Sequence, residues 1–244
     1  MAFSLFESRK SIVGCSLLKG AADNHSHILY GLDDGVKKAE ESLSILSWLE
    51  EQGLQELWLT PHVMEDVPNT TDAIKDRFAE LSAMYKGPIR LRLAAEYMMD
   101  NLFRERLAKR DLLLHGDDRV LVETSILAPP IDFYDLLDEI MSAGYRPLLA
   151  HPERYRYMSS KDYARLHSKG VLMQLNLPAL TGYYGRDAAI RARYLLDKGW
   201  YAMTGSDCHR KHVIVKQYGE KQVLKSRLLS KLTPLMEPRE FYDF

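Results

Sequence analysis

The chain has 244 residues, of which 46% are hydrophobic, and its formal net charge is -1. This length supplies one sizeable core, and α/β barrels routinely use it for a single domain. A nucleic-acid-binding protein normally carries a basic excess, so the balanced charge predicts no nucleic-acid partner. The longest nearly apolar run, residues 12–18, is too short to span a bilayer, which predicts no stable membrane insertion.

Apolar strands and amphipathic helices alternate along the chain. The predicted strands are residues 22–27, 56–61, 89–97, 119–123, 146–150, 171–176 and 201–205. The predicted helices are residues 39–51, 71–85, 101–108, 131–143, 161–168 and 187–198. A glycine follows four of these helices, where a left-handed C-terminal cap is expected: Gly53, Gly144, Gly170 and Gly199.

The order of these elements indicates the fold. Six or seven βα units in series predict a parallel sheet with crossover helices, and their number favours a closed barrel over an open sheet. In such a barrel the chemistry lies at the C-terminal ends of the strands. We expect residues 1–20 to be an N-terminal extension packed on the outside, and residues 21–244 to form a single barrel domain.

Side chains that can bind metals gather at the ends of the predicted strands. They are His25, His27, His62, Glu96, Glu123, His151, Asp207 and His209, with Asp33 and Asp34 in a Gly-rich loop after the first strand. Strand side chains alternate, so His25 and His27 face one side, as do Asp207 and His209. The first and last strands of a closed barrel are neighbours, which brings the two pairs together.

A single histidine at a strand end is more often a hydrogen-bonded structural residue than a metal ligand. Here, however, five of the eight histidines fall at such positions. The other three, His115, His167 and His212, are interpreted as ordinary surface or packing residues. The recurrence at strand ends therefore predicts a metal site.

Neither cysteine fits a catalytic role. Cys15 and Cys208 form no CxxC pair and no disulfide framework, which favours a reducing, cytoplasmic location. Cysteine-dependent phosphatases need a Cys-x5-Arg loop, but the residues six positions after these cysteines are Ala21 and Ile214. A nucleophilic cysteine of that kind is excluded.

Five sequence motifs resemble those of the PHP (polymerase and histidinol phosphatase) family. They are DNHSHILYGLDDG (residues 23–35), TPH (60–62), AAEYMMD (94–100), HPERY (151–155) and GSDCH (205–209). Within the family they look most like the bacterial manganese-dependent protein-tyrosine phosphatases of capsule and exopolysaccharide loci. Tyr30, where that branch typically has proline, and Ser26, where cysteine is common, depart from its pattern without removing a ligand.

The resemblance implies a distorted (β/α)7 TIM-like barrel of the PHP type with two to three divalent metal ions. Manganese is the first expectation, and iron or zinc are alternatives, because the donors are nitrogen and oxygen without thiolate. Asp33 is expected to support the loop. The implied ligand sets are His25, His27, Glu96 and Asp207 for the first ion, Glu96, Glu123 and His151 for the second, and Asp34, His62 and His209 for the third.

The function implied is a metal-dependent phosphoesterase, specifically a protein-tyrosine phosphatase acting on a cytoplasmic tyrosine kinase tail in polysaccharide synthesis or export. A metal-bound hydroxide would attack phosphorus. Arg154 is the candidate for gripping the phosphate, with a structural ion pair as its alternative, and Asp207 could shuttle a proton to the leaving group. Tyr183 and Tyr184, beside Gly182, are predicted to pack, with stacking on a substrate ring as the alternative.

Three other functions compete with this one. The first is a phosphatase for small molecules such as histidinol phosphate, since it would share the same ligands. The second is a metal-binding regulatory module that has lost catalysis, although all nine ligand positions are present. The third is a metal-dependent amidase barrel, which would usually need a carboxylated lysine or a two-metal set, and no lysine lies at a predicted strand end.

Overall fold

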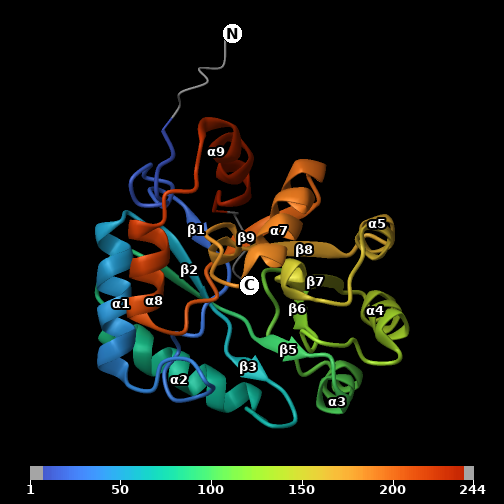
Figure 1. The fold of residues 1–244 in the computed structure, drawn as a ribbon. Coiled ribbons are helices and arrows are strands. Elements are labelled where there is room, and N and C mark those ends of the chain that lie inside the picture. Colours follow the sequence, from blue (N-terminus) through green and yellow to red (C-terminus); the bar gives the residue numbers. More distant parts are fainter. Residues whose placement is uncertain (1–7, 239–244) are drawn as a thin grey trace.

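Parallel strands form a ring in the structure, a computed structural model that describes residues 8–238 (Figure 1). One sheet has the order β1-β2-β4 and the other β3-β5-β6-β7-β8-β9. The two sheets run into each other because only two residues separate β2 (Glu56–Leu59) from β3 (His62–Val63), and two separate β4 (Arg90–Leu93) from β5 (Glu96–Met98). The predicted α/β barrel of parallel strands is confirmed.

The ring closes between its first and last strands, β1 (Ala22–Asp23) and β9 (Tyr201–Gly205). Backbone hydrogen bonds join them: Asn24 N donates to Thr204 O at 3.2 Å, Asp207 N to His25 O at 2.9 Å and His27 N to Cys208 O at 3.0 Å. The remaining strands are β6 (Arg119–Glu123), β7 (Arg146–Ala150) and β8 (Leu172–Asn176). Closure places the first predicted ligands in the chain, His25 and His27, beside the last ones, Asp207 and His209.

Two predicted strands are interrupted, and the predicted strand 56–61 is shortened to β2. Residues 22–27 were predicted as one strand, but β1 ends at Asp23, and only the isolated bridge between Ser26 and Cys208 continues it. Residues 89–97 form two strands, β4 and β5, because the chain changes partners at Ala94 and Ala95. Each interruption occurs where the strand approaches the cluster of ligand-type side chains.

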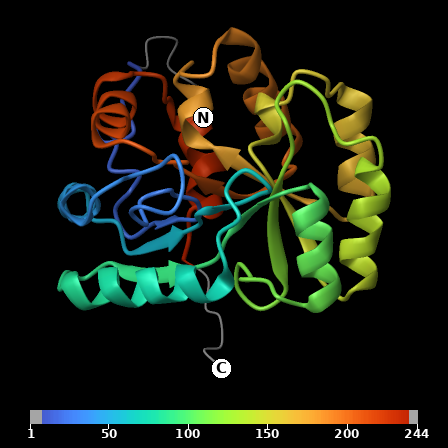
Figure 2. The same ribbon diagram turned by 90° about the horizontal axis from the view of Figure 1, so that it is seen from below.

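The helices lie outside the ring, as Figure 2 shows from below. The six predicted helices are present, with ends that shift by at most two residues: α1 (Ala39–Glu51), α2 (Thr71–Met84), α3 (Asn101–Lys109), α4 (Phe133–Ser142), α5 (Ser160–Ser168) and α7 (Arg186–Lys198). Short helices α6 (Leu177–Leu180), α8 (Lys211–Val215) and α9 (Ser226–Leu232) were not predicted. The four predicted capping glycines have positive φ angles; Gly199, for example, caps α7 at φ 69°.

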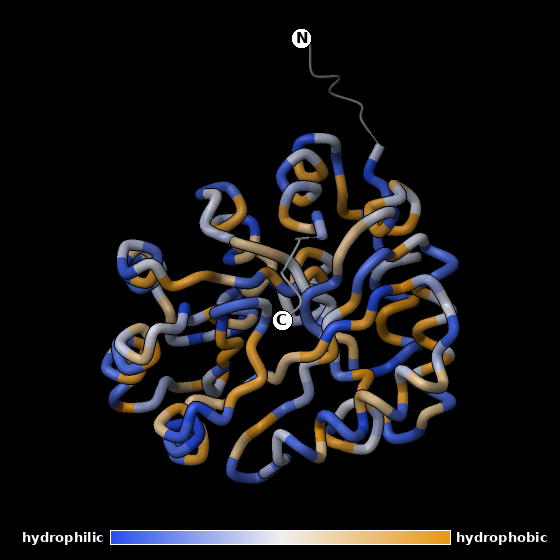
Figure 3. The backbone as a smooth tube through the Cα atoms, turned by 180° about the vertical axis from the view of Figure 1, so that it is seen from behind, coloured by the Kyte–Doolittle hydropathy of each residue, from blue (hydrophilic) through white to orange (hydrophobic). Residues whose placement is uncertain are grey.

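Apolar residues fill two spaces. The larger cluster lies between strands and helices, and a small one, formed by Leu121, Leu148, Ala150 and Met203, is separate from it. Leu121 lies on the same face of β6 as Glu123, so the small cluster lies under the polar cluster inside the ring. Figure 3 shows hydrophilic segments around the periphery and apolar ones toward the interior.

The segment before β1 packs against the C-terminal part of the chain. Lys10 forms an isolated antiparallel bridge with Leu224, and Val13 N donates to Tyr218 O at 3.0 Å. Ile12 and Leu18 are buried in the larger apolar cluster. The division into an extension and a barrel at residue 20 stays a prediction. Within residues 8–238, no helix is long and apolar enough to cross a bilayer.

Candidate metal centre

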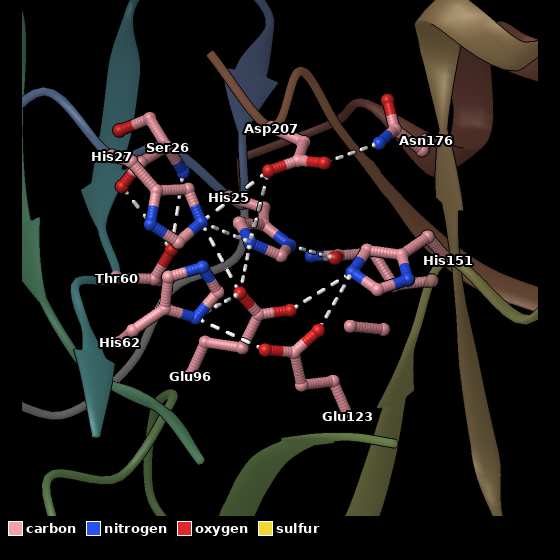
Figure 4. A network of polar contacts seen from close by, with 12 residues as sticks. His25, Ser26, His27, Thr60, His62, Glu96, Glu123, His151, Asn176 and Asp207 are labelled. Atoms are coloured by element: carbon pink, nitrogen blue, oxygen red, sulfur yellow. Dashed lines mark hydrogen bonds and ion pairs between the residues drawn. The ribbon is translucent and has the colours of Figure 1, made fainter. Parts of the chain in front are cut away.

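All nine predicted ligands meet at the same end of the barrel, and Figure 4 labels all of them except Asp34 and His209. The loops after β1 and β9 supply His25, His27, Asp34, Asp207 and His209; β3 and β5 begin with His62 and Glu96; and β6 and β7 end at Glu123 and before His151. Three groups of these residues have ligand atoms within 4.8 Å of one another: His27, Asp34, His62 and His209; His25, His27 and Glu96; and His62, Glu96 and Glu123.

Glu96 lies at the centre of the cluster and is fully buried. Its Oε2 lies 3.1 Å from His25 Nε2, 3.2 Å from His27 Nε2 and 3.1 Å from His62 Nδ1. Its Oε1 lies 3.0 Å from His151 Nε2. One carboxylate thus faces four imidazoles, an arrangement that suits a bridging ligand.

The other carboxylates extend the cluster on either side of Glu96. Asp207 Oδ1 lies 3.3 Å from His27 Nε2 and 3.4 Å from His209 Nδ1. Glu123 Oε1 lies 3.1 Å from His62 Nδ1. Asp34, whose side chain is 74% exposed, lies at the mouth, with Oδ1 3.2 Å from His209 Nε2.

The orientation of the imidazoles leaves room for cations. His25 Nδ1 faces the side-chain oxygen Oε1 of Gln174 at 2.7 Å, and His27 Nδ1 faces Asp33 Oδ2 at 2.8 Å. Both Nδ1 atoms must therefore carry a hydrogen, so in the neutral rings both Nε2 atoms carry lone pairs. These two Nε2 atoms are only 2.9 Å apart and face Glu96. Facing lone pairs and a buried carboxylate require a proton or a metal ion between them, so the residues fit a metal.

Buried atoms without a hydrogen bond point to the same space. Glu96 Oε2 and His62 Nδ1 are both buried and have none. Burial disfavours charge on Glu96, yet the neighbouring His25 and His62 hold its pKa well below the usual value. Burial likewise opposes protonation of His25, but Glu96 and Asp207 raise its pKa. The site favours negative carboxylates surrounded by positive charge.

Two residues that the sequence did not single out, Gln174 and Asn176, and Tyr184, which it predicted only to pack, hold the ligand-type side chains in place. Gln174 orients His25 and donates through Nε2 to Asn24 O at 3.0 Å. Asn176 Nδ2 donates to Asp207 Oδ2 at 2.8 Å, and Tyr184 OH donates to the same oxygen at 3.2 Å. The available signal was the alternation of Gln174 and Asn176 in an otherwise apolar predicted strand, which places both on one face. Tyr184 had no such signal.

Asp33 has the supporting role expected of it. Its Oδ2 accepts hydrogen bonds from His27 Nδ1 and from His62 N, at 2.8 and 3.0 Å. Its Oδ1 accepts from Gly35 N at 2.9 Å. One carboxylate thus fixes two ligands and the loop that carries Asp34.

Arg154 forms an ion pair in this structure. Its Nη1 lies 2.7 Å from Asp207 Oδ2, and its guanidinium lies 4.4 Å from the centre of the Tyr184 ring. Arg154, Tyr183, Tyr184 and Asp207 line a cavity of about 170 Å³ beside the cluster. Tyr184 therefore packs on Arg154, whereas Tyr183 is 47% exposed. The arginine is next to the cluster but belongs to none of the three groups.

Cys208 is buried, and its Sγ lies 3.9 Å from Arg210 O. Among the described residues, the three ligand groups do not include it. Two predicted ligands that follow strand ends have strained backbones: His151 has φ 35° and Asp207 has φ 52°, in the left-handed region. Such backbone costs about 1–3 kcal/mol per residue and gathers at functional sites.

Fold and cluster together define the class: this is an α/β-barrel protein whose fold matches the PHP and amidohydrolase barrels, with groups of histidine and carboxylate side chains that could hold metal ions. Residues 21–217 match the family described as "Capsular polysaccharide synthesis, CpsB/CapC". The chain belongs to the CpsB/CapC family.

Named relatives agree with this membership. The chain is 28% identical over 225 residues to "Tyrosine-protein phosphatase CpsB" of Streptococcus pneumoniae, covering 82% of this chain and 92% of that protein. It is 26% identical over 194 residues to "Tyrosine-protein phosphatase YwqE" of Bacillus subtilis, covering 77% and 76%. A crystal structure from work on these two proteins, described as "unique metal-dependent tyrosine phosphatases", superposes with a TM-score of 0.73 at 24% identity, covering 88% of this chain and 94% of that one.

Proposed function

We propose that this chain is a metal-dependent protein-tyrosine phosphatase of polysaccharide synthesis. The observation that carries the proposal is the convergence of five imidazoles and four carboxylates on one centre at the end of the barrel. The names of the relatives supply the substrate class, a phosphotyrosine protein. The proposal also includes two predictions made from the sequence: the substrate is the tail of a tyrosine kinase, and the protein is located in the cytoplasm.

The proposed ligand sets follow the resemblance, and the distances support them. The first set is His25, His27, Glu96 and Asp207; the second is Glu96, Glu123 and His151; the third is Asp34, His62 and His209. Glu96 would bridge the first two ions. His27 and His62 each belong to two of the three geometric groups, so they lie where neighbouring ions would approach each other.

Bound divalent ions would supply positive charge for the phosphate and lower the pKa of water that they hold. Manganese is the proposed metal, with iron or zinc as alternatives, because hard and intermediate donors are mixed and thiolate is absent from the three groups. Elemental analysis tests the identity of the metal and should find two to three transition ions per chain.

The chain's own residues would bind and orient the substrate. Arg154 is the proposed phosphate-binding cation, because a guanidinium offers two parallel donors and this one borders the cavity beside Asp207. Tyr184 holds the guanidinium plane from one side. The pKa of Asp207, which burial would raise, is held well below its usual value by His27, His25 and Arg154. Asp207 is therefore better suited to be a ligand than a proton donor.

The decisive experiment compares three variants. His151→Ala should lose metal as well as activity. Arg154→Ala should keep its metals and fold but turn over a phosphotyrosine peptide roughly 30- to 1,000-fold more slowly, the effect of about 2–4 kcal/mol for one electrostatic donor. Arg156→Ala is the matched control, since Arg156 is exposed two residues away and should behave like the wild type.

A substrate panel separates the competing functions. Phosphotyrosine peptides should be hydrolysed faster than histidinol phosphate and sugar phosphates. The reverse order would establish a small-molecule phosphatase and overturn the proposal. Absence of turnover from protein with a full metal complement would point instead to a regulatory module.

A further inference from the structure

A second pocket of unusual charge lies near α9, away from the metal centre. Its volume is about 330 Å³. Its lining consists of five cationic side chains, one carboxylate and two apolar side chains: Arg9, Arg193, Lys225, Arg227, Lys231, Asp197, Val223 and Leu228. We call it the basic pocket.

Three separate segments build the basic pocket. The N-terminal segment is fixed there by backbone pairing, with Lys10 N donating to Leu224 O at 2.8 Å and Leu224 N to Lys10 O at 3.0 Å. This pairing places Arg9 beside Lys225. In Figure 1 the start of the described chain and α9 lie together at the top of the molecule. The third wall is the C-terminal end of α7, with Arg193 and Asp197.

The basic pocket is at the opposite end of the barrel from the metal centre. Asp197 lies at the end of α7 that leads into the start of β9, whereas Asp207 and His209 follow the end of β9. The two sites share no lining residue. Only Arg193 and Asp197 of the basic pocket fall within residues 21–217, the part that matches the family. The basic pocket is thus built mainly from segments outside the family match.

The positive charge of the basic pocket is poorly compensated. Asp197 pairs with Lys231 at 2.5 Å and lies 3.8 Å from Arg227. These cations, Lys231 foremost, lower the pKa of Asp197, which therefore stays ionised. Within residues 8–238, Arg9, Arg193 and Lys225 have no ion pair. A chain with a net charge of -1 thus gathers five cations around one carboxylate, and an anion would relieve their repulsion.

We propose that the basic pocket binds a small organic diphosphate. Three arginines offer the paired donors that match phosphate oxygens, and the excess positive charge suits an anion with several negative charges. Val223 and Leu228 provide an apolar surface for the organic part of the ligand. The site is concave and bounded on three sides, which fits a small molecule better than a membrane or a nucleic acid.

The test measures ligand binding at the basic pocket itself. Pyrophosphate and ADP are titrated separately into the full chain, and binding is followed by NMR at the amides of Val223 and Leu228. Both probes should produce saturable shifts, and ADP should bind more tightly through its organic part. In Arg193→Gln/Arg227→Gln the dissociation constant should rise at least about tenfold. Arg186→Gln, an exposed arginine at the other end of α7, is the control and should bind like the wild type.

Three results would overturn the proposal. The first is shifts confined to the amides around Asp34 and His209, which would make the metal centre the sole anion site. The second is equal binding of citrate, which would remove the assignment to phosphate. The third is binding that disappears at physiological salt, as expected for non-specific attraction. The double variant should also hydrolyse an aryl phosphate at the wild-type rate, so the result is independent of phosphatase function.

Discussion

His115 behaves differently from the histidines of the metal centre although it is as buried as His25, His27 and His151. It stacks on Trp58 with ring centres 3.9 Å apart, and its Nε2 donates to Asn24 O at 3.1 Å. Burial, with Arg119 nearby, holds its pKa well below the usual value. It is thus a neutral packing residue, as the sequence predicted, and no carboxylate raises its pKa.

This difference predicts a pH dependence of stability. His115 stays neutral in the folded chain but gains a proton below about pH 6.5 when unfolded. Its contribution to stability is therefore present above about pH 6.5 and is lost as pH falls, by up to about 1.4 kcal/mol per pH unit. In chemical denaturation between pH 7.5 and 5.5, His115→Gln should show a shallower fall in the free energy of unfolding than the wild type. Equal slopes would mean that His115 protonates in the fold.

The sequence predicted which side chains gather at the candidate metal centre better than it predicted the residues that support them. Histidine and carboxylate at strand ends carry a recognisable chemical signal, and alternation placed them on one face. Gln174 acts through a hydrogen bond to a ligand some 149 residues away, a contact that no local pattern encodes. The pairing of Arg154 with Asp207 was foreseen only as an alternative, because its partner depends on how the ring closes.

At the scale of elements, the loop between β1 and α1 depends on the absence of one side chain. A Cβ on Gly35 would overlap the His27 carbonyl oxygen, and it would lie 2.6 Å from His27 Cβ and 2.8 Å from Asp33 Oδ1. Backbone and ligand lie too close for any substituent. Gly35 therefore lets the loop fold directly over His27 and present Asp34.

Gly35→Ala should consequently displace His27 or the loop. We expect the variant to fold but to bind fewer metal ions per chain and to lose at least about tenfold in activity, because ligand placement tolerates little displacement. Gly219→Ala is the matched control, since a Cβ at Gly219 meets nothing within 4 Å. Elemental analysis and turnover are measured on both variants; full metal content in Gly35→Ala would contradict the close-packing argument.

Helices were easier to predict than strands for a physical reason. Periodicity and caps are local, so α1 has the predicted bounds and α5 begins with a capping box formed by Ser159 and Asp162. The bounds of the strands near the metal centre depend instead on the geometry of the clustered side chains. Residues 94–95 leave one sheet and join the other, so the predicted strand 89–97 is split into β4 and β5.

At the scale of the whole molecule, the metals should contribute to stability. The centre concentrates four carboxylates and five imidazoles, and Glu96 is fully buried. Ligand binding at a hundredfold excess over the dissociation constant stabilises by about 2.7 kcal/mol. Chelation should therefore lower Tm by roughly 5–10 °C for a chain of this size, and added Mn²⁺ should restore it.

The control for this prediction is His151→Ala, which lacks one ligand of the centre. Its Tm before chelation should already be lower, and chelation should change it less than it changes the wild type. Differential scanning calorimetry measures both. An unchanged Tm on chelation of fully loaded wild-type protein would show that the centre is stable without cations.

The closure of the ring between β1 and β9 affects the order of events during protein synthesis. Asn24 and Thr204, which hydrogen-bond across it, lie 180 residues apart in the chain. At typical elongation speeds a ribosome needs on the order of ten seconds or more to cover that distance. During this time His25 and His27 exist without Asp207 and His209. The metal centre is therefore completed only when nearly the whole chain has been made, so that nascent chains and truncated products remain without a complete centre.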